Sequence, residues 1–184
     1  MLAYVFWHWR RADISSAVYD RTQQRFHRAL ADAPPAGFLG SRCNDISAVP
    51  WVPPARDARE DWYLVENFAA LETLAEAAIS ASRQQPHDNA AAMADGGTAG
   101  LYRLRGSGAD LVPSRAWWFA KPAGMSYAAF DTLMAPVLAH GNAALWGRQL
   151  TLGPTPEFCL QADAPVTLPS SLEPLTTALR PVWP

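Results

Sequence analysis

The chain has 184 residues, 49% of them hydrophobic and 17% charged, with a formal net charge of -2. This length supports one large domain or two small ones with a sizeable core. The mixed, near-neutral charge argues against nucleic acid as a partner, and no apolar run approaches the roughly 20 residues of a membrane span. We therefore expect a soluble, cytoplasmic protein without a membrane partner, whose two cysteines, Cys43 and Cys159, are unpaired.

Two aromatic stretches, residues 4–9 and 117–122, resemble each other and open the two halves of the chain. Both are short, bulky and bounded by polar or turn-forming residues, which is typical of strands. Because side chains alternate along a strand, each stretch presents two aromatic rings and then a titratable group on one face. These are Tyr4, Phe6 and His8 in the first stretch, and Trp117, Phe119 and Lys121 in the second.

The rest of the first half has the pattern helix, strand, strand, helix, strand. We predict a helix from Ala17 to Leu30 after cap candidates at 13–16, strands at 37–43 and 61–66, a helix over 71–79 capped by Asn67, and a strand at 101–105. A proline-rich loop at 48–60 separates the two middle strands. Residues 84–100 are polar and small, and we predict them to be irregular apart from a helical turn at 90–94.

The second half repeats this order in a reduced form. We predict a strand at 116–121, a helix from Tyr127 to Leu138 capped by Ser126, strands at 144–147 and 157–160, a short helix at 170–179 and a strand stub at 180–183. Pro136 lies inside the helical pattern and should kink or shorten that helix.

The order strand, helix, strand, strand, helix, strand is that of a ferredoxin-like unit. Its repetition resembles the dimeric α/β-barrel superfamily, which includes antibiotic-biosynthesis monooxygenase-like and chlorite dismutase-like proteins. The resemblance implies an α+β fold in which tandem ferredoxin-like units, 1–108 and a shorter 114–184, pair into an α/β barrel within one chain. It also implies a ligand cavity within or between the sheets. A barrel closed inside one chain should be a monomer or a weak homodimer.

The matched faces of the two opening strands are the candidate site. We expect His8 and Lys121 to be catalytic groups at a shared cavity, with Glu66 as a supporting carboxylate. The walls would be Tyr4, Phe6, Trp117 and Phe119, with Arg42 binding an anionic group and His87 at the cavity mouth. The opposite face, with Val5, Trp7 and Trp118, would pack under the helices. The alternative is that the charged groups meet solvent at strand ends and the aromatic rings fill a core.

The motifs of common enzymes are missing from this sequence. It contains no nucleophile elbow, phosphate-binding glycine loop or dinucleotide fingerprint. No two histidines have metal-ligand spacing, so we expect no metal and no cofactor; haem would require His8 or His87 as its axial ligand. His27, among polar neighbours, should be exposed. Two functions stay open. The first is a protein that binds a small organic molecule in an aromatic cavity, or that holds a ligand or partner on the loop at 48–60. The second is a metal-independent monooxygenase-like or isomerase-like enzyme acting on a small aromatic or polyketide-like substrate.

Overall fold

The computed structural model describes residues 1–108 and 110–184. Within them, eight antiparallel strands close into a barrel in the order β1-β3-β2-β8-β5-β7-β6-β4. The strands are β1 (Leu2–Arg10), β2 (Phe38–Ile46), β3 (Ala58–Val65), β4 (Ala94–Gly106), β5 (Arg115–Phe119), β6 (Ala143–Arg148), β7 (Phe158–Ala162) and β8 (Leu175–Trp183). The helices are α1 (Ser16–Asp32), α2 (Phe68–Ala78), α3 (Ala81–Met93) and α4 (Tyr127–Leu138), with a short 3-10 helix, η1 (Ser170–Leu172). The predicted α+β class is confirmed.

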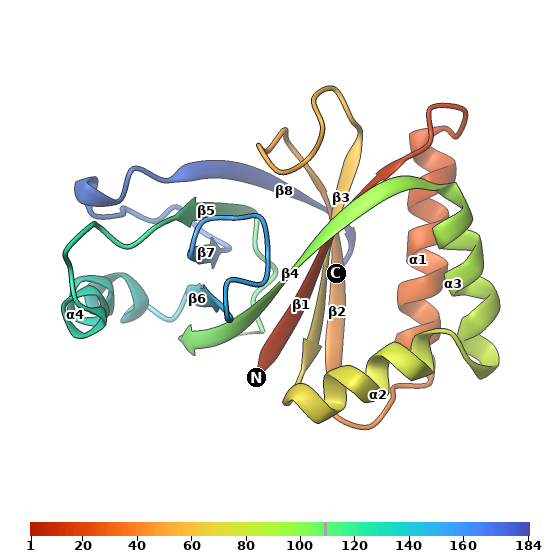
Figure 1. Cartoon of the computed structure of the whole chain (residues 1–184), viewed down its shortest axis with the longest axis horizontal. Helices are drawn as coiled ribbons and strands as arrows, with labels where there is room; N and C mark the ends of the chain where they lie inside the picture. Colours follow the sequence, from red (N-terminus) through yellow and green to blue (C-terminus); the bar gives the residue numbers. More distant parts are fainter. Residues whose placement is uncertain (109) are drawn as a thin grey trace.

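Each half of the chain supplies four neighbouring strands in the same relative order. These are β4-β1-β3-β2 from the first half and β8-β5-β7-β6 from the second. Helices α1, α2 and α3 lie against the first four strands, and α4 lies beside the second four (Figure 1). This confirms the tandem ferredoxin-like arrangement closed within one chain. The division into units 1–108 and 114–184 stays a prediction, because both halves share one closed sheet.

Helices α1, α2 and α4 begin where the sequence supplies a capping side chain, whereas Ser80 makes no such cap at the start of α3. Ser15, Asn67 and Ser126 each accept a hydrogen bond from a backbone N–H three residues later, at the start of α1, α2 and α4. Such caps satisfy N–H groups that have no partner within the helix. No helix of the described residues is long and apolar enough to cross a membrane.

Residues 84–100 were wrongly predicted to be irregular outside the helical turn at 90–94. They belong to α3 and to β4, which pairs with the full length of β1. The glycines that suggested a loop are required by this pairing: a Cβ atom on Gly97 would lie 2.4 Å from the ring of Phe6, and one on Gly96 would lie 2.7 Å from the ring of Trp9. A glycine in a strand can therefore mark the close approach of an aromatic side chain.

The predicted helix at 170–179 was also wrong, because only the short η1 is helical there and residues 175–179 begin strand β8. After η1, Glu173 has a left-handed backbone (φ 43°) and is followed by Pro174, so the helix ends. Strand β8 then pairs with β5 over Leu175–Ala178 and with β2 over Leu179–Trp183. Closure of the barrel needs a strand between β2 and β5, and β8 fills that gap.

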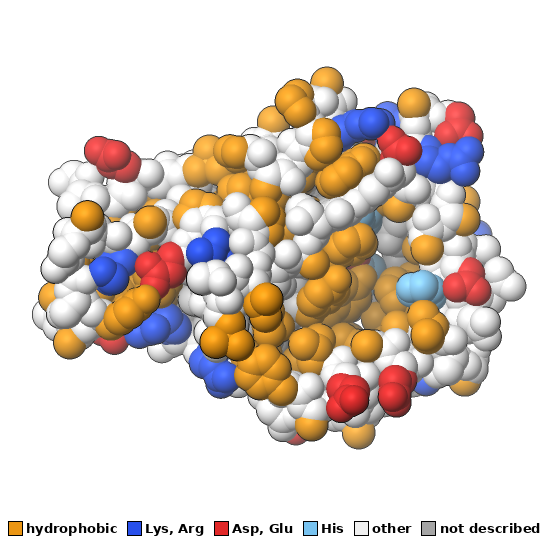
Figure 2. Space-filling view, in the orientation of Figure 1, with side chains coloured by type: hydrophobic (Ala, Val, Ile, Leu, Met, Phe, Trp, Pro, Cys, Tyr) orange, Lys and Arg blue, Asp and Glu red, His pale blue; other side chains and the backbone are white. Residues whose placement is uncertain are grey.

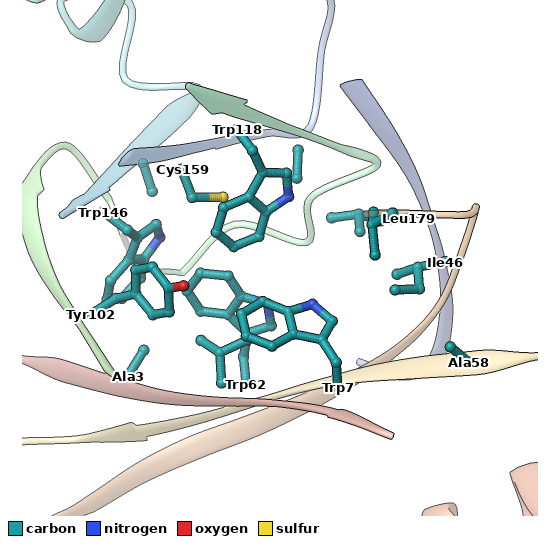
Figure 3. Packing of buried hydrophobic residues seen from close by; sticks show 14 of the residues in the cluster. Ala3, Trp7, Ile46, Ala58, Trp62, Tyr102, Trp118, Trp146, Cys159 and Leu179 are labelled. Carbon is teal, nitrogen blue, oxygen red and sulfur yellow. The ribbon is translucent and has the colours of Figure 1, made fainter. Parts of the chain in front are cut away.

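The barrel interior is filled by indole rings from both halves (Figure 3). Trp7 and Trp118 meet edge to face with their ring centroids 5.6 Å apart, and Trp62 and Trp146 lie 5.2 Å apart. Val5 lies in the same cluster. The prediction that Val5, Trp7 and Trp118 pack under the helices was therefore wrong, since the barrel encloses this face of β1 and β5.

A carboxylate, Glu60, is buried among these rings. Its two oxygens accept hydrogen bonds from Nε1 of Trp7 at 2.7 Å and from Nε1 of Trp62 at 2.6 Å. Burial raises the pKa of Glu60 to about 7, although both hydrogen bonds act in the opposite direction. The folded protein thus holds a proton on Glu60 at pH values where the unfolded chain has released it.

This proton makes stability depend on pH. The pKa of Glu60 rises from 4.5 to about 7 on folding. The contribution of this proton to the stability of the folded protein is therefore full below pH 4.5 and is lost as the pH rises to about 7. We expect the free energy of unfolding to fall by about 3 kcal/mol over that window, as measured by urea unfolding. Glu60→Gln should flatten the profile and the exposed control Glu66→Gln should not; a Glu60→Gln profile as steep as the wild type would contradict the assignment.

Candidate functional site

A cavity of about 510 Å³ lies between the outer face of the first four strands and helices α1, α2 and α3. Figure 2 shows a hollow lined with hydrophobic side chains at this place. Its sheet wall and α1 supply the rings of Tyr4, Phe6, Phe26 and Tyr63. Helices α2 and α3 contribute Leu71 and Leu74 and four small side chains, Ala75, Ala78, Ala90 and Ala91, and β4 adds Ala94. The space exists because these helices present methyl groups where larger side chains would fill it.

The polar end of the cavity centres on Asp61 of β3, which is 1% exposed. Its carboxylate accepts a hydrogen bond from the Tyr63 hydroxyl at 2.7 Å and lies 3.2 Å from Nε2 of both His8 and His27. Burial alone would raise the pKa of Asp61, but the two histidines outweigh it and hold this pKa well below its usual value. Asp61 is therefore an ionised carboxylate in a largely apolar setting.

His8 of β1 links this carboxylate to the cavity. Its Nδ1 lies 2.5 Å from the hydroxyl of Tyr19 on α1, and its ring stacks on Phe6 with a centroid distance of 5.2 Å. Its Nε2 is buried and has no hydrogen-bond partner in the described part of the chain. Burial, and then Asp61, raise the pKa of Tyr19, so this side chain stays a neutral hydroxyl. Nε2 of His8 thus faces Asp61 at 3.2 Å without the geometry of a hydrogen bond, and the His8 side chain also lines the cavity.

Four of the predicted site residues line this cavity: Tyr4, Phe6, His8 and His87. His87 lies on α3, with its ring 5.5 Å from that of Phe26. The prediction had placed His87 in a loop, whereas the helix turns it towards the cavity. The roles proposed for these four residues in binding or catalysis stay predictions.

The second opening strand does not share this cavity, contrary to the prediction. Trp117 and Phe119 pack in a separate cluster, with Phe130 of α4 and Phe158 of β7. Lys121 donates a hydrogen bond to the carbonyl oxygen of Met125 and lies over the ring of Tyr127, and it does not line the cavity beside His8. The matched faces of β1 and β5 both lie outside the barrel, so each is covered by its own helices.

Arg42 and Glu66 are also separate from the cavity. Arg42 lies in the barrel interior, where it donates hydrogen bonds to the Leu111 carbonyl at 2.8 Å and to Gln161 at 3.2 Å, beneath the ring of Trp62. Burial lowers its pKa. Glu66 follows β3 and is exposed. The expectations that Glu66 supports His8 and that Arg42 binds an anionic group in this cavity were wrong. Glu66 lies just beyond the end of β3, and Arg42 lies on the face of β2 that the barrel encloses.

Sequence reasoning missed the residues that surround His8. His27 was predicted to be exposed, but it is fully buried with Nδ1 2.7 Å from Ser41 Oγ. Tyr19, Gln23 and His27 recur at four-residue spacing, which indicates one helix face. Asp61 shares its strand face with Tyr63, and a carboxylate in a strand of bulky residues signals a polar site. These two signals together could have located the cluster.

No protein-family model matches the chain, and no curated protein matches its sequence. Among solved structures, the chain is similar to a candidate monooxygenase from Lactobacillus acidophilus, with a TM-score of 0.52 and 9% identity over 99% of this chain and 94% of that one. It is also similar to a candidate chlorite dismutase, with a TM-score of 0.52 and 11% identity over 98% of this chain and 95% of that one. At these identities the likeness shows the fold alone.

Proposed function

We propose that the cavity beside β1 binds a small, flat, largely apolar organic molecule with one polar group. The chain that forms this cavity has the fold of the dimeric α/β-barrel superfamily. The observation that carries this proposal is the imidazole of His8, which lines the polar end of an aromatic cavity of about 510 Å³ beside Asp61 and whose Nε2 makes no hydrogen bond within the described residues. That volume falls within the roughly 300–1,000 Å³ of small-molecule sites. The apolar body would pack on the rings, and the polar group would meet His8.

A pair of matched probes tests this arrangement. The prediction is that 1-naphthol binds at least about tenfold more tightly than naphthalene, because a hydrogen bond to His8 contributes about 1.4 kcal/mol. Calorimetry with both probes measures this preference. His8→Phe keeps a ring but removes both nitrogens, so it should abolish the preference while naphthalene still binds. Equal binding of both probes by the wild type would contradict the proposed polar contact.

The location of the ligand is tested by filling the cavity. Ala90 lies on α3, is 7% exposed and lines the cavity, so Ala90→Phe should place a ring in the space and weaken 1-naphthol binding at least about tenfold. Ala129→Phe makes the same change on an exposed face of α4 and should leave binding unaltered. If both variants bind the probe as the wild type does, the ligand does not occupy this cavity.

The contact between His8 and Asp61 favours a second candidate, a metal-independent monooxygenase-like or isomerase-like enzyme on a small aromatic or polyketide-like substrate. In that case Nε2 of His8 would accept a proton from the bound molecule, and the adjacent Asp61 carboxylate would stabilise the resulting imidazolium. Solvent-derived deuterium appearing in a bound ring ketone, and its loss in His8→Phe, would support the enzyme over simple binding.

A further inference from the structure

A cysteine completes the cluster at the polar end of the cavity. Cys43 of β2 pairs directly with Asp61 of β3 in the strand register, and His8 lies on β1 at the other side of β3. One ring nitrogen of His8, the Sγ of Cys43 and one carboxylate oxygen of Asp61 all lie within 4.8 Å of one another. Three buried side chains that can bind a metal are therefore gathered from three adjacent strands.

The distance between His8 and Asp61 resembles that between two ligands of one metal ion. His8 Nε2 lies 3.2 Å from the nearer oxygen of Asp61. Ligands about 2.0–2.2 Å from a tetrahedral zinc ion lie about 3.3–3.6 Å from each other. Nε2 of His8 also has no hydrogen-bond partner, so the nitrogen that would bind the ion is not committed elsewhere.

The surroundings of the cluster support the same chemistry. A histidine that binds a metal through one nitrogen usually donates the other N–H to an oxygen, and Nδ1 of His8 lies 2.5 Å from the Tyr19 hydroxyl. The carboxylate of Asp61 is held by Tyr63, which donates to it at 2.7 Å, and by His27 at 3.2 Å from its other oxygen. Each ligand on β1 and β3 is thus oriented by a neighbouring side chain.

We propose that His8, Cys43 and Asp61 bind one divalent transition-metal ion, for which a nitrogen, a sulfur and an oxygen ligand favour zinc. The thiolate and the carboxylate would balance the two positive charges of the ion, so the buried site would be neutral. His8 and Asp61 line the cavity whereas Cys43 does not, so the remaining coordination position faces the cavity. The three residues are distant in sequence, which explains why ligand spacing gave no sign of them.

This inference goes beyond the proposed function, because the ion needs no organic ligand in order to bind. It does change the role of His8. A metal ion on Nε2 takes the lone pair that would accept a proton, so the polar group of a cavity ligand would bind the ion instead. The metal site and the metal-independent enzyme are therefore mutually exclusive roles for the same nitrogen.

Cobalt titration of the full chain after chelator treatment tests the site. We expect one Co²⁺ per chain, a thiolate-to-cobalt charge-transfer band, and loss of that band when Zn²⁺ displaces the cobalt. Cys43→Ser should remove the band and weaken cobalt binding by more than about 100-fold. That loss exceeds the roughly 10- to 100-fold expected for removing a side chain that only orients a metal ligand. Cys159→Ser is the matched control, since Cys159 is also fully buried but lies in the barrel interior, and both band and affinity should persist.

Two further variants separate metal binding from folding. His8→Gln should weaken cobalt binding as strongly as Cys43→Ser, and Tyr19→Phe should weaken it about 10- to 100-fold, while circular dichroism shows native folding for both. Binding without a thiolate band, a band that survives Cys43→Ser, or no binding by the folded wild type would overturn the proposal. The naphthol measurements on chelator-treated protein test the organic ligand separately, so either proposal can fail alone.

Discussion

Trp118→Ala should lower the free energy of unfolding by about 3–5 kcal/mol, as expected for removing a fully buried indole. Trp118 is 1% exposed and its ring contacts those of Trp7, Trp51 and Tyr102 at centroid distances of 5.2–5.7 Å. Trp7 and Tyr102 come from the first half of the chain and Trp118 from the second. The lost contacts therefore join the two halves at the centre of the barrel.

Urea unfolding measures this loss, and two variants calibrate it. Trp118→Phe keeps an aromatic ring and should cost clearly less than the alanine variant. Trp183→Ala removes the same side chain from a half-buried position beside the C-terminus, so its cost should be less than half as large. Equal costs at positions 118 and 183 would contradict the view that the interior cluster holds the barrel together.

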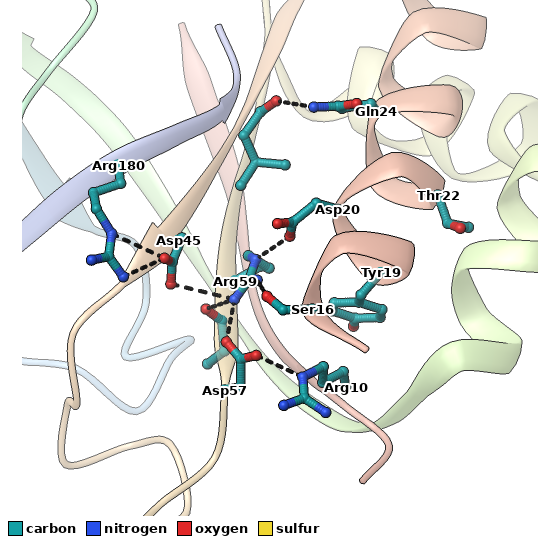
Figure 4. Close-up of polar contacts among 12 residues, drawn as sticks. Arg10, Ser16, Tyr19, Asp20, Thr22, Gln24, Asp45, Asp57, Arg59 and Arg180 are labelled. Carbon is teal, nitrogen blue, oxygen red and sulfur yellow. Dashed lines mark hydrogen bonds and ion pairs between the residues drawn. The ribbon is translucent and has the colours of Figure 1, made fainter. Parts of the chain in front are cut away.

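Arg59→Met should lower the free energy of unfolding by about 3 kcal/mol, at the low end of the cost of breaking a buried ion pair. Arg59 of β3 is 1% exposed and joins β3 to α1 (Figure 4). It donates hydrogen bonds to Asp20 at 2.7 Å, Asp57 at 2.6 Å and Ser16 at 2.6 Å. Burial alone would lower the pKa of Arg59, but these carboxylates raise it, so the guanidinium stays charged.

The control for this variant uses a shared partner. Arg59 donates to Asp45 at 3.3 Å and Arg180 donates to the same carboxylate at 3.0 Å from Nε. The Arg180 side chain is 76% exposed, so Arg180→Met should cost less than about 1 kcal/mol. Because Arg59 holds the start of α1, its loss should also displace Tyr19 and weaken 1-naphthol binding. Equal stability of the two variants would show that the buried network does not anchor α1.

The fold could be predicted largely from local signals. Capping residues, the helical spacing from Tyr19 to Leu30 and the repeated aromatic strands each act over a few residues, and together they indicated two ferredoxin-like halves. Where the prediction failed, a distant partner decided the outcome. The glycines at 96 and 97 form a strand because they lie under the rings of β1, and residues 175–183 form a strand because β2 and β5 need one between them.

The candidate site depended far more on tertiary structure. Alternation along β1 separates Tyr4, Phe6 and His8 from Val5 and Trp7, and that separation is correct. The alternation of side chains along β1 does not show which of its faces the barrel encloses. That depends on the direction in which the sheet of strands β3 to β8 curves to close on β1. The sequence by itself therefore determined which residues share a face. Only the closed sheet and the packing of α1 decided that His8 meets Asp61, His27 and Cys43 rather than Lys121, since those contacts join residues far apart in the chain.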